Sequence, residues 1–335
     1  MRATPSDLAK WAFWVPLRST MDPGRQLQVQ SMAAAWRLQW MTAGRQRAIM
    51  EEEYRKWLGS RLTDRGYATL IRDAYRASFR THLEELLLGK LNKKNIDQWV
   101  ELKGIENIKD ALSINKGAIW VYPHAGPIML MIAALAYRDF HYTQYAARGL
   151  APPDIAEAHP ELLAHNHLRD AVRRAREANE NQLPVEFLTL DEPVRTLHRH
   201  LNENRIVGLA FDGRIGSGWF PTPFLNRTAL LSTGPWKLAC STGAPVLPVF
   251  CHTPVGQPAC IEVGEPISSG PDWKNLAQNT IAEHERWLQQ HPEEYGTWLL
   301  HTRERSNIDD HPLFIDTAQD DRHLRWMPDE KPQLR

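Results

Sequence analysis

Short apolar segments that alternate with helix-like segments constrain the fold of this chain more than any other feature. Ala118–Tyr122, Ile206–Phe211 and Pro245–Cys251 carry no charge and are rich in β-branched and aromatic side chains. Apolar runs of this length are typical of strands that are buried on both faces in a parallel sheet. Further strands are expected at 100–104, 185–188 and 259–263, and helices at 105–114, 128–137, 193–203, 230–241 and 275–290. This alternation predicts an α/β fold with a mostly parallel central sheet flanked by helices.

The two ends of the chain lack this alternation. Residues 28–53 and 67–88 contain no proline and are rich in Ala, Leu, Arg and Glu, a composition that favours helices. From residue 306 onwards the chain is rich in Asp, Arg and Pro without any period. We therefore expect a helical N-terminal segment at 1–97, an α/β domain at 98–305 and a polar, loosely packed C-terminal tail at 306–335.

Composition narrows the class of protein. Forty Lys and Arg side chains balance forty Asp and Glu side chains, and no nucleic-acid-binding motif is present, so nucleic acid is not an expected partner. A hydrophobic fraction of 42% is ordinary for a folded domain and excludes a disordered chain. The three cysteines include no Cys-x-x-Cys pair, so neither a disulfide framework nor a structural zinc site is expected.

Residues 1–50 are more basic than the rest of the chain. They hold seven basic side chains against two acidic ones, together with Trp11, Phe13, Trp14, Trp36 and Trp40. Indole rings and guanidinium groups favour an anionic membrane surface, because the rings settle at the level of the headgroups and the cations meet lipid phosphates. The alternative is a helical segment whose tryptophans pack inward onto a core.

One uncharged stretch is long enough to be considered as a membrane span. Ala118–Tyr137 is twenty residues long and contains no Lys, Arg, Asp or Glu. Pro123, Gly126 and Pro127 interrupt it, and these residues would leave backbone groups without hydrogen bonds in lipid. A buried strand, a tight turn and a buried helix explain the stretch better, so no transmembrane helix is expected.

Two polar residues directly follow predicted strands. His124 lies in the turn Pro-His-Ala-Gly-Pro, and Asp212 begins the loop Asp-Gly-Arg-Ile-Gly-Ser-Gly. Open α/β sheets bind ligands at the carboxyl ends of their strands. A neutral imidazole in that place can accept a proton from a hydroxyl group, which makes His124 a candidate general base. The alternative is a structural histidine bonded to a backbone carbonyl.

Glycines and arginines around these two residues form a candidate ligand site. Glycine lets a ligand approach the backbone, whose N–H groups can then bind a phosphate or a tetrahedral oxyanion. Arginine can pair with phosphates or carboxylates. The residues concerned are Gly126, Gly213, Arg214, Gly216, Gly218 and Arg227. The alternatives are ordinary turn chemistry for the glycines and a solvated surface for the arginines.

Four blocks of sequence, taken in order, resemble a known family. They are Ala118-Ile-Trp-Val-Tyr-Pro-His-Ala-Gly-Pro, the segment from Asp212 to Ala229, Thr242-Gly-Ala-Pro-Val-Leu-Pro-Val-Phe, and His291-Pro-Glu-Glu-Tyr-Gly-Thr-Trp-Leu-Leu-His-Thr-Arg. In this order they are similar to the late (secondary) acyltransferases of lipid A synthesis, within the lysophospholipid acyltransferase superfamily. The resemblance covers residues 100–305 approximately. Residues 1–97 resemble the family's helical start only loosely, and its membrane-spanning N-terminal helix is not evident.

The resemblance implies a reaction and a place for it. A fatty acyl group would pass from a thioester of acyl carrier protein or coenzyme A to a hydroxyl of a lipid or glycolipid acceptor. No metal or redox cofactor is implied. The protein would work at the cytoplasmic face of the inner membrane, bound peripherally or monotopically. Arg148 lies where the superfamily often has an arginine that binds the acceptor or a phosphate.

One position departs from the family's pattern. The family's histidine is followed five residues later by an Asp or Glu that orients the imidazole ring, and this position is Met129 here. Methionine cannot accept the second ring N–H. A carboxylate elsewhere can replace the acid, with Asp212 as the first candidate and Asp139 as the second. Alternatively, a backbone carbonyl orients the ring, or the protein has lost catalysis and binds acyl chains, carrier protein or a membrane surface.

Overall fold

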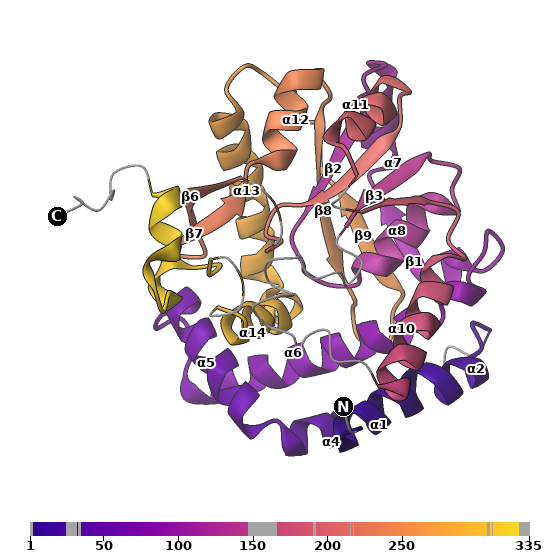
Figure 1. Ribbon diagram of the computed structural model, residues 1–335, viewed down its shortest axis with the longest axis vertical. Coiled ribbons are helices and arrows are strands. Elements are labelled where there is room, and N and C mark those ends of the chain that lie inside the picture. Colours follow the sequence, from indigo (N-terminus) through magenta and orange to yellow (C-terminus); the bar gives the residue numbers. More distant parts are fainter. Residues whose placement is uncertain are drawn as a thin grey trace.

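A seven-stranded sheet with the order β1-β9-β8-β2-β5-β3-β4 forms the centre of the molecule (Figure 1). The computed structural model describes residues 3–24, 32, 35–146, 166–189, 192–214, 216, 218–306, 309 and 311–327. Each pairing in the sheet is parallel except that of β8 with β9. The strands are β1 (Val100–Lys103), β2 (Ala118–Tyr122), β3 (Tyr142–Tyr145), β4 (Glu186–Leu188), β5 (Ile206–Ala210), β8 (Val246–His252) and β9 (Ala259–Val263). The predicted α/β fold with a mostly parallel sheet is confirmed.

Helices cover both faces of this sheet. Helices α7, α8 and α10 contribute to one apolar cluster, and α11, α12 and α13 contribute to another. The α-helices are α1 (Pro5–Ala12), α2 (Arg18–Thr20), α4 (Trp36–Thr42), α5 (Gly44–Leu58), α6 (Asp64–Glu85), α7 (Ile105–Ser113), α8 (Ile128–Ala136), α10 (His167–Glu180), α11 (Val194–Asn202), α12 (Gly234–Thr242), α13 (Trp273–Gln290) and α14 (Gly296–Glu304). Shorter helical turns are η1 (Phe13–Leu17), η3 (Leu88–Lys90), η4 (Ile96–Gln98), η6 (Pro292–Glu294), η7 (Ile315–Thr317) and η8 (Asp321–Trp326).

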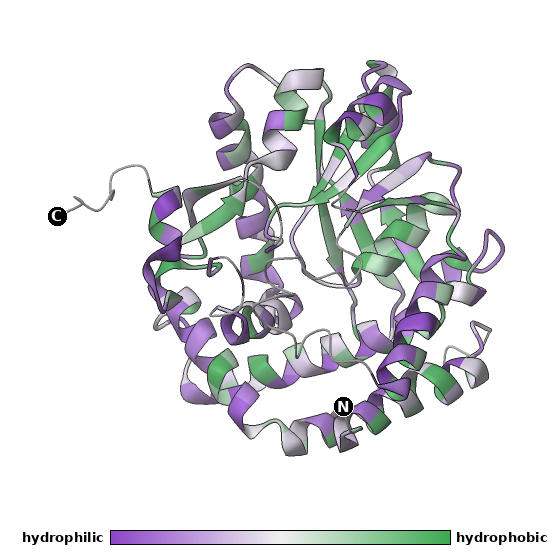
Figure 2. Ribbon diagram, in the orientation of Figure 1, coloured by the Kyte–Doolittle hydropathy of each residue, from purple (hydrophilic) through white to green (hydrophobic). Residues whose placement is uncertain are grey.

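The central strand β2 shows why an uninterrupted apolar run correctly predicts a buried strand of a parallel sheet. Trp120 belongs to the cluster on one face, whereas Ile119 and Val121 belong to the cluster on the other. Successive side chains of a strand point to opposite faces, so a strand covered on both sides must be apolar throughout. Figure 2 shows the same contrast, with hydrophobic central strands and hydrophilic residues on outer helices such as α10.

The predicted helix at 230–241 is partly wrong. β6 (Trp219–Phe224) and β7 (Arg227–Ser232) form an antiparallel hairpin, and α12 begins only at Gly234. Leu225 and Asn226 form its turn with φ values of 53° and 59°, the left-handed conformation that two-residue hairpin turns require. β6 contains two prolines, which a two-stranded ribbon tolerates because its outer edge is unpaired.

The N-terminal helices pack against the rest of the described chain. Helices α5 and α6 contact α14. Trp14 is buried, while Trp36 packs edge-on against Trp40, which packs in turn against Tyr75. Inward packing, the alternative to a lipid contact, therefore describes these three tryptophans. None of the helices in the described ranges has the length and apolar character needed to cross a membrane.

Part of the C-terminal tail is packed, contrary to the expectation of a loose tail. Leu313 and Phe314 are buried, and Phe314 bridges to Ala229 of β7. These two apolar side chains cover the hairpin. The polar composition of the tail does not indicate this packing. The boundaries at 97/98 and 305/306 stay predictions.

Candidate active site

His124 and Asp212 meet at the carboxyl edge of the sheet. β2 and β5 are neighbouring parallel strands with Tyr122 opposite Ala210, so the residues that follow them emerge at the same edge. His124 Nδ1 lies 2.6 Å from Asp212 Oδ1. The backbone N–H of His124 also donates to both carboxylate oxygens, at 3.1 and 3.0 Å. The structure thus pairs His124 with the first of the two candidate acids.

Asp212 is held as a buried carboxylate. Its side chain is inaccessible to solvent, and the Tyr295 hydroxyl donates to Oδ2 at 2.8 Å. Burial by itself raises the pKa of Asp212, but the charge and hydrogen bonds of His124, joined by the Tyr295 hydroxyl, lower it below its ordinary value. An ionised carboxylate only accepts hydrogen bonds, so Nδ1 of a neutral His124 carries the proton and Nε2 carries the lone pair.

The His124 ring is fixed in direction and partly open to solvent. It stacks on Trp298 with ring centroids 3.8 Å apart and an interplanar angle of 12°. A Cβ atom at Gly213 would lie 3.8 Å from its Cε1 atom, so the first glycine of the loop borders the ring. The side chain is 30% exposed, and Nε2 forms no hydrogen bond with any residue in the described ranges. This ring nitrogen is the group that can act on a ligand.

Tyr295 and Trp298 are site residues that the sequence did not single out individually. Both come from the block His291–Arg303, and their three-residue spacing places them on one side of the start of α14. Glu294, in the same block, accepts the Gly126 N–H through its backbone carbonyl at 3.2 Å. In the sequence, Tyr295 and Trp298 were indicated only by their place in a block that resembles the family.

A model of the bacterial lipid A biosynthesis acyltransferase family matches residues 64–304, most of the chain. The chain belongs to this family. The match includes His124, Asp212, Tyr295 and Trp298. The resemblance seen in the sequence is therefore confirmed, and acyltransferase activity with an acyl donor and a lipid acceptor follows in general terms. Comparison with curated proteins finds no match.

The glycines of this acyltransferase have different surroundings. Gly126 has φ +67°, and a Cβ there would lie 2.1 Å from the Cys251 carbonyl oxygen, so close backbone packing requires glycine. Its N–H is already used by Glu294. A Cβ at Gly218 would lie 2.7 Å from Thr233 Oγ1, which places Gly218 against the start of α12. Gly216 lies between two residues outside the described ranges, so among these glycines only Gly213 is seen beside His124.

The two candidate arginines bind protein groups, which corrects their expected role as ligand contacts. Arg214 is buried and donates to the backbone carbonyls of Asp212, Leu230 and Pro312, and burial lowers its pKa to about 10. Arg227 is 6% exposed and pairs with Glu53 at 2.5 Å and Asp316 at 2.6 Å. Both side chains therefore brace the loop and the hairpin. Arg148, the other expected contact, lies outside the described residues.

The two remaining candidate residues have other partners in the described chain. Asp139 is 77% exposed and pairs with Lys93. Met129, in the first turn of α8, is partly buried against an apolar cluster.

We expect Met129→Glu to change the rate of acyl transfer by less than about tenfold, because the imidazole already has its carboxylate partner. Steady-state rates of the two proteins check this. A much larger gain would mean that Asp212 supports His124 poorly.

Two buried glutamates, Glu294 and Glu84, have raised pKa values. Glu294 Oε1 accepts the Thr253 N–H at 2.9 Å, and burial raises its pKa to about 8. Burial also raises the pKa of Glu84 to about 7, although Arg80 pairs with it at 2.8 Å. Near neutral pH the Glu294 side chain is therefore held as a neutral acid.

The Glu294→Gln variant should show a pH-dependent gain in stability. The folded protein keeps a proton on Glu294 that the unfolded chain loses above its ordinary pKa of 4.5, so the free energy of unfolding falls as pH rises from 4.5 to about 8. Glutamine avoids this loss while keeping an oxygen for the Thr253 N–H. We expect a gain of roughly 2–5 kcal/mol at pH 9 and little at pH 5.

Thermal unfolding at both pH values measures this effect. Glu293→Gln, at a neighbouring side chain that is 31% exposed, is the matched control. An equal difference in Tm at pH 5 and pH 9 would contradict the prediction.

Proposed function

We propose that this protein transfers a fatty acyl group from a thioester of acyl carrier protein or coenzyme A to a hydroxyl of a lipid or glycolipid acceptor, with His124 as the general base. The observation that carries the proposal is the 2.6 Å contact between His124 Nδ1 and the buried Asp212 carboxylate. It supplies the oriented base that acyl transfer to a hydroxyl needs. The family match supports the class of reaction.

The groups of the site suit each step of this transfer. His124 Nε2 accepts the hydroxyl proton while the hydroxyl oxygen attacks the thioester carbonyl carbon. Asp212 stabilises the imidazolium that forms, as a triad aspartate does. The C–S bond then breaks, and the imidazolium returns its proton to the departing sulfur, which yields an ester and a thiol. The step uses no redox or metal group.

Gly213 is the candidate donor to the oxyanion of the tetrahedral intermediate. It borders the imidazole ring, and its backbone N–H has no partner among the described residues. A backbone N–H beside the reacting carbonyl can stabilise negative charge as it develops.

An assay with defined substrates tests the proposal. Purified protein is incubated with acyl-carrier-protein or acyl-coenzyme A thioesters and a lipid extract, and mass spectrometry follows acylated lipid and free thiol. Equal amounts of new ester and thiol are expected. Binding of acyl chains or carrier protein without turnover would favour the alternative, a catalytically impaired member of the family, which Met129 first suggested.

We further propose that the protein works at the cytoplasmic face of the inner membrane, bound peripherally through its N-terminal helices. α4 supports this, because Leu38 and Met41 are 70% and 77% exposed and lie one turn apart. Residues 25–50 contain four arginines and no acidic residue. An apolar pair beside unopposed cations suits an anionic lipid surface, even though the tryptophans nearby pack inward.

The double variant Leu38→Ser with Met41→Ser should bind anionic vesicles at least about 100-fold more weakly than the unchanged protein, because burying each side chain is worth roughly 1.5–3 kcal/mol and every 1.4 kcal/mol or so is a factor of ten. Binding should also weaken with salt. Vesicle sedimentation measures both effects. Ile114→Ser is the control. Ile114 is 52% exposed, but it precedes the amino end of β2, at the edge of the sheet opposite to His124. Equal binding of the unchanged protein to anionic and neutral vesicles would contradict the proposal.

A further inference from the structure

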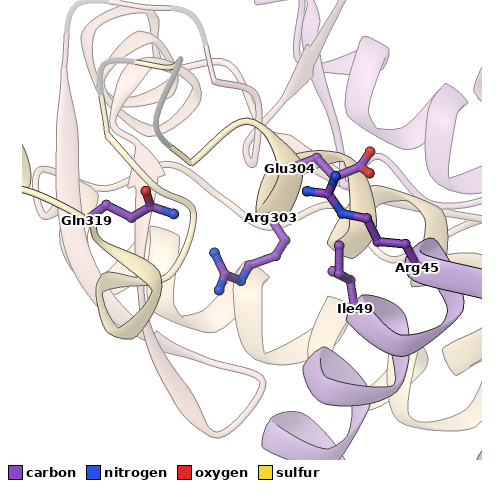
Figure 3. A pocket seen from close by; sticks show the side chains of 5 residues that line it. All are labelled: Arg45, Ile49, Arg303, Glu304 and Gln319. Carbon is purple, nitrogen blue, oxygen red and sulfur yellow. The ribbon is translucent and has the colours of Figure 1, made fainter.

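A small cavity lies between α5, the end of α14 and the segment that follows η7 (Figure 3). It has a volume of about 210 Å³ and is lined by Arg45, Ile49, Arg303, Glu304 and Gln319. Pockets that bury a drug-sized ligand measure roughly 300–1,000 Å³. The cavity therefore suits a small polar group rather than an acyl chain.

Arg303 brings an incompletely satisfied guanidinium group to this cavity. The side chain is 27% exposed, and Figure 3 shows it pointing toward Gln319. Its Nη1 donates only to Ser306 Oγ at 3.4 Å, and its buried Nε forms no hydrogen bond. Nε lies 3.5 Å from Glu53 Oε1, but the other oxygen of Glu53 is paired with Arg227 at 2.5 Å. A half-buried cation with unused donors is stabilised by any anion that reaches it.

Arg45 adds a second cation from the opposite wall. It is exposed on α5 and forms no ion pair with the residues that the structure describes. Glu304 is the acidic residue among the five that line the cavity, so these side chains carry one net positive charge. The Gln319 amide supplies further donors on the third side.

We propose that this cavity binds the phosphate group of a phosphorylated substrate. A phosphate presents three or more oxygens and can accept hydrogen bonds from two guanidinium groups and an amide together, whereas one guanidinium already satisfies both oxygens of a carboxylate. The source of the phosphate is either a lipid headgroup or a water-soluble phosphate ester.

Helix α14 connects the cavity to the proposed catalytic residue His124. Trp298, which stacks on His124, and Arg303 both belong to α14. Five residues of an α-helix span about 7.5 Å along its axis. The same five residues turn about 140° around that axis, so the cavity and His124 lie on different sides of α14. A phosphate held by Arg303 would therefore fix the far end of an extended substrate that passes around the helix to His124, an assignment that rests on the proposed function.

Titration calorimetry with glycerol 3-phosphate tests the cavity in the full chain. Arg45→Gln and Arg303→Gln should each weaken binding about tenfold, because each removes a charge-assisted contact. Glu304→Gln, the matched control in the same cavity, should bind at least as tightly as the unchanged protein. Arg45→Gln is the more informative variant, since this exposed side chain supports no ion pair of the described chain. Unchanged affinity in Arg45→Gln, or binding of glycerol as tight as that of its phosphate, would overturn the proposal.

Two further arms identify the source of the phosphate and separate this proposal from the proposed function. A short-chain phosphatidic acid should bind more tightly than diacylglycerol of the same chain length. If the cavity also binds phosphatidic acid more tightly than glycerol 3-phosphate, the source of the phosphate is a lipid headgroup. If the two affinities are equal, the source is a soluble ester. His124→Ala should retain phosphate binding. If acyl transfer is never detected and binding still requires both arginines, the cavity stands while the proposed function fails.

Discussion

His124→Ala should lower the rate of acyl transfer about 10²–10⁴-fold, the usual contribution of a positioned general base. The imidazole is the base in the proposed reaction, and Tyr295, the other described side chain bonded to Asp212, donates to the opposite carboxylate oxygen. The fold should persist, because the backbone N–H of residue 124 still donates to Asp212. Rates of ester formation and the thermal midpoint together measure the effect.

His124→Asn is the matched control for this prediction. Its amide can still donate a hydrogen bond toward Asp212, but it cannot accept a proton, so it should be as inactive as alanine. More than about a tenth of the original activity in either variant would mean that the imidazole is not the base.

Asp212→Asn should lower the rate at least tenfold and up to about 10⁴-fold, the loss that the corresponding change causes in a serine protease triad. Asparagine keeps the shape and can accept the Tyr295 hydroxyl. It cannot stabilise the imidazolium, and its amide donor favours the tautomer with the proton on Nε2, which is then unable to act as a base. Rates of acyl transfer at several pH values measure the loss.

Asp139→Asn is the control for this substitution, because Asp139 is the other acid that the sequence offered. It is exposed and pairs with Lys93, so its loss should leave the rate nearly unchanged. If Asp139→Asn were the more harmful change, the pairing of His124 with Asp212 would not be the catalytic one.

Some features of the fold have a local signal in the sequence. β2, β5 and β8 were found because each is buried on both faces, which demands an uninterrupted apolar run. β3 was missed, since its residues Tyr142–Tyr145 include a buried threonine that bonds to the His200 side chain and a buried glutamine that donates to the Gly208 backbone carbonyl. β7 was read as part of a helix because an apolar run such as Leu230–Leu231 fits either structure, and only its pairing with β6 decides between them.

The two residues at the centre of the candidate site could be predicted from the sequence. His124 and Asp212 each follow a strand directly, and the ends of parallel strands share an edge of the sheet, so their chemistry could be predicted. That β2 and β5 are neighbours, which brings the imidazole to a carboxylate distant in sequence, is a property of the sheet order. This order has no local signal in the sequence, because it depends on how the helices cover both faces of the sheet.

The tertiary structure also decided what each remaining polar side chain does. Arg214 and Arg227 looked like ligand contacts, yet one binds backbone carbonyls and the other binds Glu53. Arg303 was not a candidate ligand contact in the sequence, although its guanidinium lines a cavity and has unused hydrogen-bond donors. An arginine carries the same charge in each of these places, and its role depends on which acids and carbonyls the fold brings within hydrogen-bonding distance. Those partners come from segments far apart in the chain, so no local pattern could have revealed them.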